Sequence, residues 1–523
     1  MINSILNRYT DYVSFQNFKT DTDLITDPDL IKEQIKNHFD QWTECRSINQ
    51  QIFNSTWKSC YDPISSINSS HYDNILNIII VEEITHTFQN LPNNKARSSL
   101  GISYKMLKHA GDVFLQTITI LLNRCLTSQL IPKQWKEGYI FPISKKPVFD
   151  GNLHNTRPIS LIEHIKKLYT KILTNRLSIS LMSKQILSPL NYVALPGNST
   201  STPIYILNNI IEDSYCNNKE LWLLSQDMSK AYDSVNTNLL QKSLERIQLP
   251  PQLTQIILNL LSDRSNKVIT NFGLTQSYSV RNGIDQGETI TPLLWRIYYD
   301  PLISQISKKY KGYNLGVSWI TDLKLKQTQQ LQTSTSVLAF MDDTLWIAPS
   351  KNELEQILTL ASSFFTMANI QVNPLKSILS TNSKNPTPIN FIQQTITPQP
   401  KNTPFKFLGC WFLPNYQQTQ QTNLIVQESN NLTNILKTKQ ITDKQVAYII
   451  NTVIIPTLEY RIHNIVLSKT TCERILSTYI TIAKHKSNLS RSIPNSVMLN
   501  HNIYGIKNIW DIQLQHYISK FLF

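Results

Sequence analysis

The sequence of 523 residues has no long apolar segment, no closely spaced cysteines and no leader-like start. No apolar run approaches the roughly 18 residues that a membrane-spanning helix requires, so we expect no membrane span. The first residues, Met1–Arg8, lack a charged region followed by an apolar one, so we expect no secretory signal. The six cysteines are dispersed and none follow CxxC spacing, which predicts reduced thiols and argues against a zinc site.

Glycine is also scarce, with 12 residues, and we attribute this and the abundance of Asn, Ile, Gln and Thr to the coding DNA. The net charge of +14 is unevenly distributed. Residues 1–94 contain 6 basic and 12 acidic residues, residues 95–176 contain 14 and 4, and residues 424–523 contain 11 and 5. The two basic blocks favour binding of a polyanion, although lysines and arginines that only solvate helix faces are the alternative.

A pair of adjacent carboxylates, Asp342-Asp343, lies between the apolar residues of the segment Leu338–Ala348. The pattern predicts two short strands joined by a tight turn that carries both acids, with a solvated turn as the alternative. A third carboxylate, Asp227, ends a second strand-like run that begins at Leu221. If the two strands are neighbours, the three acids meet at one point. That arrangement holds two divalent ions about 3.5–4 Å apart for displacement at phosphorus.

Helical spacing of apolar residues alternates with loops from Val81 to about Ser214, after an acidic and mostly helical segment 1–80. Pro250-Pro251 would stop one of the later helices. We expect helices at residues 29–39, after a candidate N-cap at Thr237, after a capping box formed by Ser350 and Glu353, and from about Leu424 to the end of the chain.

Three other segments have distinct compositions. Residues 140–161 interleave Pro with Lys and Arg and predict a hairpin-like basic loop. Gln327–Ser336 is a polar insert of low complexity immediately before the doublet strand. Residues 405–412 are strand-like and lie between polar loops near 381–403 and 413–423.

Several motifs follow one another in a fixed order. Ser225–Val235 is similar to the reverse transcriptase motif D-x-x-K-A-F/Y-D-x-V, Gly283–Leu293 to G-x-x-Q-G-x-x-x-S-P-x-L, and Phe340–Asp343 to F/Y-x-D-D. Val372–Ser377 resembles the family's lysine-bearing motif, and Phe407–Cys410 resembles its primer-grip strand. Upstream, Ile131–Trp135 and Arg157–Leu161 resemble its fingers signature. From about residue 81 the chain therefore resembles the reverse transcriptase of a non-LTR (LINE-type) retrotransposon.

Three positions depart from the family pattern. The family's Gly-Pro-Asp-Gly run after an early lysine is replaced by Lys95–Ile102, which keeps the lysine and the last glycine. Asp285 stands where the family often has a basic or neutral residue, and Thr291 replaces a serine. These changes affect the expected fingers geometry and leave the three acids in place.

The resemblance implies an α+β right-hand polymerase with an antiparallel palm sheet, helix-rich fingers and a helical thumb. We expect four regions along the chain. They are a helical acidic N-terminal extension at 1–80, fingers at 81–215, a palm at 216–412, and a basic helical thumb at 424–523 that a longer chain would continue.

The resemblance also assigns roles to the acids. Asp227 and Asp342 would bridge two Mg²⁺ ions, with Mn²⁺ as a substitute, and Asp343 would support them. Lys376 would protonate the leaving pyrophosphate as a general acid, and a surface lysine on a turn is the alternative. Asp233 is interpreted as structural or as a helix-start acid, because one strand rarely supplies two inward carboxylates at that spacing.

The nucleotide site is assigned in the same way. Lys145 and Arg157 would grip the triphosphate, with template backbone or solvent as the alternative. Tyr232 would exclude a 2′-hydroxyl and so favour deoxynucleotides, with a core aromatic as the alternative. Gln286 and Gly287 would line the nucleotide and template pocket. The primer grip would be formed by Phe407, Leu408 and Gly409.

These assignments predict an RNA-directed DNA polymerase that binds an RNA template, a DNA primer and dNTPs, without a membrane or a small-molecule cofactor. It would act as a ribonucleoprotein in the nucleus, the cytoplasm or both, and would not be secreted. One alternative is an RNA-dependent RNA polymerase, which Tyr232 and the Gln286-Gly287 motif oppose. The other is a catalytically impaired nucleic-acid-binding relic, which the three intact acids oppose.

Overall fold

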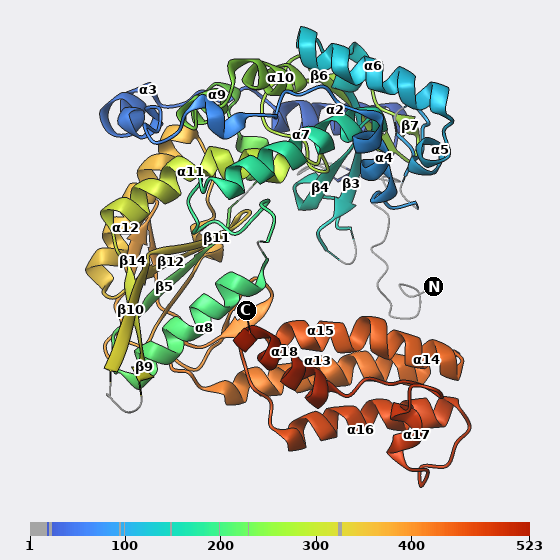
Figure 1. Cartoon of the computed structure of the whole chain (residues 1–523), viewed down its shortest axis with the longest axis vertical. Coiled ribbons are helices and arrows are strands. Elements are labelled where there is room, and N and C mark those ends of the chain that lie inside the picture. The colour runs from blue at the N-terminus through green and yellow to red at the C-terminus, as the bar shows by residue number, and fades with distance from the viewer. Residues whose placement is uncertain are drawn as a thin grey trace.

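The chain is represented by a computed structural model, shown in Figure 1. The residues that the structure describes are 18–19, 24–93, 96–98, 100–146, 149–197, 199–228, 230–322 and 327–522. Lys95 and most of the segment before residue 24 lie outside them. In this described part of the chain, no helix is both long enough and apolar enough to cross a membrane.

A four-stranded antiparallel sheet lies on the left side of the molecule as Figure 1 shows it. Its strands, in spatial order, are β11 (Val337–Phe340), β12 (Asp343–Ala348), β5 (Trp222–Gln226) and β13 (Ile378–Thr381). Helices cover both faces of the sheet, which is why β5 and β12 are continuous apolar runs in the sequence. The α+β class and the antiparallel sheet expected from the sequence are confirmed.

Alternate side chains of the central strands enter different apolar clusters. Trp222 and Trp346 pack with α11 (Thr291–Lys309) and α12 (Lys351–Ala368) on one face. Leu223 and Leu345 pack with α8 (Ser201–Cys216) on the other. The indole N–H of Trp346 donates to Gln226 Oε1 at 2.8 Å, so the tryptophan buries no unpaired polar atom.

A second sheet lies beside the first and contains the hairpin that the sequence predicted near residues 140–161 (Figure 1). The N-terminal helix α2 (Pro28–Trp42) lays Ile31, Ile35 and Phe39 against its side chains Ile140, Val268, Tyr278 and Val280. The strands of this sheet are β3 (Glu137–Ser144), β4 (Thr156–Leu161), β6 (Arg264–Thr270), β7 (Gly273–Leu274) and β8 (Tyr278–Val280).

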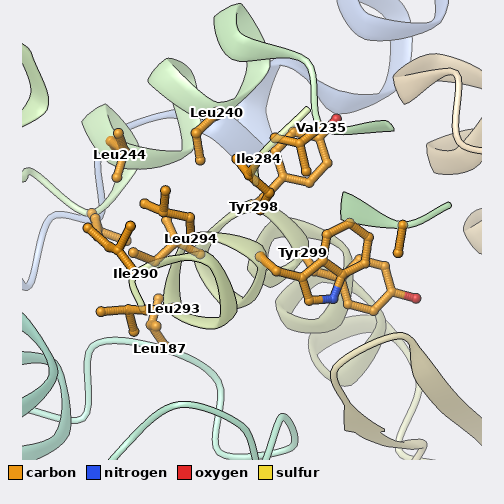
Figure 2. Packing of buried hydrophobic residues seen from close by; sticks show 14 of the residues in the cluster. Leu187, Val235, Leu240, Leu244, Ile284, Ile290, Leu293, Leu294, Tyr298 and Tyr299 are labelled. Carbon is orange, nitrogen blue, oxygen red and sulfur yellow. The ribbon is translucent and has the colours of Figure 1, made fainter. Parts of the chain in front are cut away.

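Helices of the large core surround these sheets and fix the turns between them. Figure 2 shows side chains of α9 and α11 packed with Val235 and Ile284, which lie within two of the family-like motifs. The helices are α3 (Gln50–Ile52), α4 (Val81–Gln89), α5 (Tyr104–Lys108), α6 (Asp112–Ser128), α7 (His164–Ser183), α9 (Thr237–Arg246) and α10 (Pro251–Leu261).

The C-terminal helices have an apolar core of their own, built from residues between Ile425 and Ile509. They lie at the opposite end of the molecule from α6 and α10 (Figure 1). They are α13 (Gln418–Thr438), α14 (Asp443–Ile449), α15 (Ile455–Arg461), α16 (Lys469–Lys486), α17 (Asn495–Leu499) and α18 (Ile509–Leu522). The expected helical pattern from about Leu424 is confirmed, although the first helix begins at Gln418.

Several local expectations are wrong. Asn236, not Thr237, caps α9, because its side chain accepts a hydrogen bond from the Leu239 N–H. Only half of the expected capping box forms at α12: Ser350 accepts from the Glu353 N–H, while the Glu353 carboxylate accepts from the Gly312 N–H. Much of the segment 43–80 forms turns and short 3-10 or π segments instead of regular helix.

Three segments expected to be loops or single strands form hairpins. The polar insert is β10 (Gln327–Thr335), which pairs with β9 (Tyr313–Asp322). The strand-like segment 405–412 turns back on itself as β16 (Phe405–Phe407) and β17 (Cys410–Phe412). The remaining short strands are β14 (Ile389–Phe391) and β15 (Gln394–Ile396) inside the predicted loop 381–403, and β1 (Phe18–Lys19) and β2 (Leu24–Ile25) near the N-terminus.

Candidate active site

The three predicted acids lie at one end of the strands β12 and β5 of the four-stranded sheet. Strand β12 runs antiparallel to β5 with Thr344 opposite Gln226, so Asp343 and Asp227, the next residues at this edge, lie side by side. Asp342 occupies the turn between β11 and β12, where Met341 has a positive φ of 60°. The expectation that the two strands are neighbours is therefore confirmed.

The acids repel one another. Burial, with an added effect of Asp227, raises the pKa of Asp342, and Arg157 opposes the shift. Burial followed by repulsion from Asp342 and Asp227 raises the pKa of Asp343 to about 6. Such crowding of like charge costs free energy that a bound cation would recover.

The donor set suits an ion that also takes ligands from a substrate. Among the described residues, no three acidic, histidine or cysteine side chains converge tightly enough to make a complete metal cage. Asp227 and Asp342 nevertheless line the same cavity wall. A hard divalent ion such as Mg²⁺ is commonly held by one or two carboxylates together with substrate phosphates and water, so these two acids fit that mode of binding.

This cavity has a volume of about 760 Å³ and collects residues from distant motifs. Asp343 and Gly287 are not among its lining residues, although each adjoins one that is. The predicted site residues that line it are Asp227, Asp342, Lys145, Arg157, Tyr232, Gln286 and Lys376.

Three cations share the lining of this cavity with the acids. Lys145 follows β3, Arg157 lies in β4, and Lys376 ends a short 3-10 turn. Burial, followed by repulsion from Arg157 and Lys376, lowers the pKa of Lys145. Its ammonium also donates to the carbonyl of His154 at 3.2 Å. Cations this close to one another form a site for an anion.

Tyr232 lies on the cavity wall beside the acidic turn. Its hydroxyl donates to the sulfur of Met341 at 2.8 Å, and its ring meets Trp295 edge-on at 6.0 Å. The indole N–H of Trp295 donates to the Met341 carbonyl at 2.8 Å. The tyrosine ring and the turn that carries Asp342 are therefore fixed against each other.

The Gln286-Gly287 segment packs against β4. The Gln286 carbonyl accepts a hydrogen bond from the Ser160 N–H at 2.8 Å. Gly287 has a φ of +109°, and a Cβ there would lie 3.2 Å from the Ser160 carbonyl oxygen, so this position requires glycine. Asp285, one of the residues that depart from the family pattern, forms a buried ion pair with Arg264 at 2.8 Å.

A comparison with protein families bears directly on this arrangement. The family model described as reverse transcriptase (RNA-dependent DNA polymerase) matches residues 143–412, slightly more than half of the chain. This chain belongs to the reverse transcriptase family. Membership implies a general dependence on divalent metal and leaves the identity of the ion open.

Curated relatives of this reverse transcriptase come from mobile elements, which confirms the predicted resemblance. "Probable RNA-directed DNA polymerase from transposon BS" of Drosophila melanogaster is 26% identical over 42% of this chain and 24% of that protein. "Retrovirus-related Pol polyprotein from type-1 retrotransposable element R2" of Popillia japonica is 24% identical over 44% of this chain and 30% of that protein. The chain thus spans less than a third of the length of these relatives.

Among solved structures, "Structure of apo telomerase from Candida Tropicalis" is similar with a TM-score of 0.37 and 13% identity. The similarity covers 77% of this chain and 68% of that chain.

The predicted primer-grip residues lie apart from the cavity lining. Leu408 and Gly409, both with positive φ, make the turn of the β16–β17 hairpin that follows Phe407. The hydroxyl of Tyr460 in α15 donates to the Leu408 carbonyl at 2.6 Å, and Arg461 donates to the Gly409 carbonyl. The C-terminal helices of this reverse transcriptase therefore hold the turn in place.

The sequence did not reveal the contribution of the N-terminal helix. Trp42, at the end of α2, lines the cavity together with Lys230 and His154. No motif in the sequence marks residues 1–80. The signal was absent because Trp42 acts through Asp233, which is 191 positions away in the chain.

Proposed function

We propose that this chain is the RNA-directed DNA polymerase of a non-LTR retrotransposon. It would extend a DNA primer on an RNA template by adding deoxynucleotides from dNTPs. The observation that carries the proposal is the single cavity in which Asp227 and Asp342 face Lys145, Arg157 and Lys376. Relatives named as polymerases of transposons and of retrotransposable elements support the same conclusion.

Two Mg²⁺ ions, when bound, would activate the primer 3′-hydroxyl and neutralise charge on the phosphates. The side chains of Asp227 and Asp342 would hold them, with Asp343 adding negative charge at the same edge. On the opposite wall, Lys145 and Arg157 would hold the triphosphate oxygens of the incoming nucleotide. The primer oxygen then bonds to the α-phosphorus, and the bond to pyrophosphate breaks.

Other residues would set the orientation of the reactants. Lys376 would give a proton to the leaving pyrophosphate. Tyr232 would pack on the sugar and exclude a 2′-hydroxyl, while Gln286 and Gly287 would align the nucleotide with the template base. The turn at Leu408 and Gly409 would hold the primer end.

The regional assignment supports the same function. We assign residues 81–215 to the fingers, 216–412 to the palm and 424–523 to a thumb that grips the primer–template duplex through its backbone. The thumb region contains 11 basic and 5 acidic residues, which suits contact with phosphates. We also propose that the protein acts in the nucleus, the cytoplasm or both.

Primer extension on an RNA template with dNTPs and MgCl₂ tests the proposal. The double variant Asp342→Ala/Asp343→Ala should form no product and should still bind RNA, because the acids supply no positive charge to that contact. The matched control is Asp263→Asn, whose carboxylate is 88% exposed and lies outside the cavity lining, and it should extend the primer normally.

The outcomes separate the alternatives. Unchanged product from the double variant would refute the assignment. A wild-type protein that binds RNA without incorporating nucleotide would be a catalytically impaired relic. In a parallel reaction with NTPs in place of dNTPs, a product that RNase destroys and DNase spares would identify an RNA polymerase instead.

A further inference from the structure

The N-terminal helix α2 ends at the nucleotide cavity. Its last residue, Trp42, is only 5% exposed and lines the cavity near Lys145 and Asp227. The rest of the buried face of α2 packs on the second sheet, away from the cavity. Trp42 is thus the point at which a helix outside all family-like motifs reaches the proposed substrate site.

One indole ring contacts both ends of the turn that follows Asp227. The Trp42 N–H donates to Asp233 Oδ2 at 2.9 Å, a buried hydrogen bond. The ammonium of Lys230 lies 3.3 Å from the centroid of the same ring, in a cation–π contact. Tyr232, the proposed sugar-contacting residue, lies between these two anchors.

The turn needs external support. Lys230 has a φ of +55°, a left-handed conformation that side-chain-bearing residues seldom adopt without compensation. Asp233 is 8% exposed and also accepts a weak hydrogen bond from Gln286 Nε2 at 3.4 Å. Asp233 is therefore where α2, the turn and the Gln286 segment meet.

The end of α2 and the residues just after it are held by contacts of their own. The Thr43 carbonyl accepts from the Arg281 N–H at 3.2 Å, and Asp40 pairs with Arg281 at 3.8 Å. Further along, the Arg46 carbonyl accepts from Asn236 Nδ2 at 2.7 Å. Trp42 is thus a side chain on a docked helix end and not a mobile surface group.

We propose that Trp42 is a positioning residue that holds the ammonium of Lys230 toward the cavity, where it contacts the triphosphate of the incoming nucleotide. The inference rests on the proposed polymerase function and deepens it. Lys230 adds a fourth cation to the three already placed around the cavity. Because the contact is to the substrate and not to the reacting bond, loss of Trp42 weakens nucleotide binding more than it slows the chemical step.

Steady-state incorporation of dTTP on an RNA template provides the first test. Trp42→Ala and Lys230→Gln should each raise the KM for dTTP by about tenfold, while kcat and RNA affinity change by less than about twofold. The double variant should be no worse than either single variant, because both remove the same contact. Trp42→Phe keeps an aromatic ring face, so its KM for dTTP should lie between those of the wild type and Trp42→Ala.

Ile35→Ala is the matched control, because Ile35 is fully buried on the same helix and packs only in the cluster against the second sheet. It should lower the melting temperature without changing the KM. A KM that stays at the wild-type value in Trp42→Ala would overturn the proposal. The proposal would also be overturned if the increase in KM of the double variant equalled the product of the two single increases.

Calorimetric binding of dTTP in MgCl₂ separates this inference from the proposed function. If the wild type binds dTTP and Trp42→Ala binds it about tenfold more weakly, the inference holds even in a protein that incorporates no nucleotide. If the wild type does not bind dTTP, or if Trp42→Ala binds it equally well, the inference is overturned.

Discussion

The acidic and the basic wall of the cavity are built in different ways. Asp227 directly follows β5 and Asp342 lies in the β11–β12 turn, at one end of a sheet that is covered on both faces and whose strand pairing fixes the register. Lys145, Arg157 and Lys376 come from a hairpin and a separate 3-10 turn. Divalent ions require ligands held within about half an ångström, whereas a phosphate responds to summed positive charge over a longer range. The ion ligands therefore come from one end of a single sheet, whereas the cations come from two separate elements.

The largest effect should follow a change in the acidic wall. Asp227→Asn removes a charge with little change of shape and should lower the single-turnover rate of primer extension by at least about 1,000-fold, because the charge on the reacting phosphates is no longer balanced. We expect MgCl₂ to raise the melting temperature of the wild type and not that of the variant. If more than about a tenth of the rate remained, Asp227 would not act as an ion ligand.

A second change concerns Tyr232, which lines the cavity beside the turn that carries Asp342. Tyr232→Ala opens the space beside the Asp342 turn and should lower the preference for dTTP over UTP by about 100-fold, measured as the ratio of kcat/KM values. Tyr215→Ala is the control, since that ring is 57% exposed and does not line the cavity. An unchanged preference in Tyr232→Ala would make this tyrosine a packing residue.

The basic wall should tolerate single losses better than the acidic wall. Arg157→Ala should raise the KM for dTTP by about tenfold, because Lys145 and Lys376 remain to attract the triphosphate. Lys133→Ala, outside the cavity lining, serves as the control. If Arg157→Ala were as damaging as Asp227→Asn, the contrast between a rigid and a shared wall would be wrong.

The same contrast explains how much of the site the sequence could predict. The acids were found because strand patterns and turns are local, whereas the pairing of β5 with β12 was a condition of the prediction that only the structure supplies. Trp42 was missed because its partners lie far along the chain.

The missed fold elements have the same explanation. Strand β10 was interpreted as a polar insert, because its Gln and Thr residues show no apolar alternation in the sequence. The cap of α9 was displaced by one residue, since both Asn236 and Thr237 are good N-cap types.

The smallest expected effect lies behind the basic wall, at His38 of α2. Burial, with repulsion from His154 and Lys230, lowers the pKa of His38 to about 4. In the unfolded chain this imidazole takes up a proton near pH 6.5, whereas in the folded protein it stays neutral to about pH 4. The unfolded state therefore binds more protons between these values, and stability falls as the pH drops from 6.5 towards 4.

Between pH 7 and pH 5 we expect His38 to cost about 1 kcal/mol of unfolding free energy, after a discount for its residual contact with solvent. Urea unfolding at the two pH values should show that His38→Gln, which cannot titrate, loses about that much less than the wild type on acidification. His109→Gln, at an exposed position, should behave like the wild type. Equal losses in His38→Gln and the wild type would mean that the folded protein does not lower the pKa of His38.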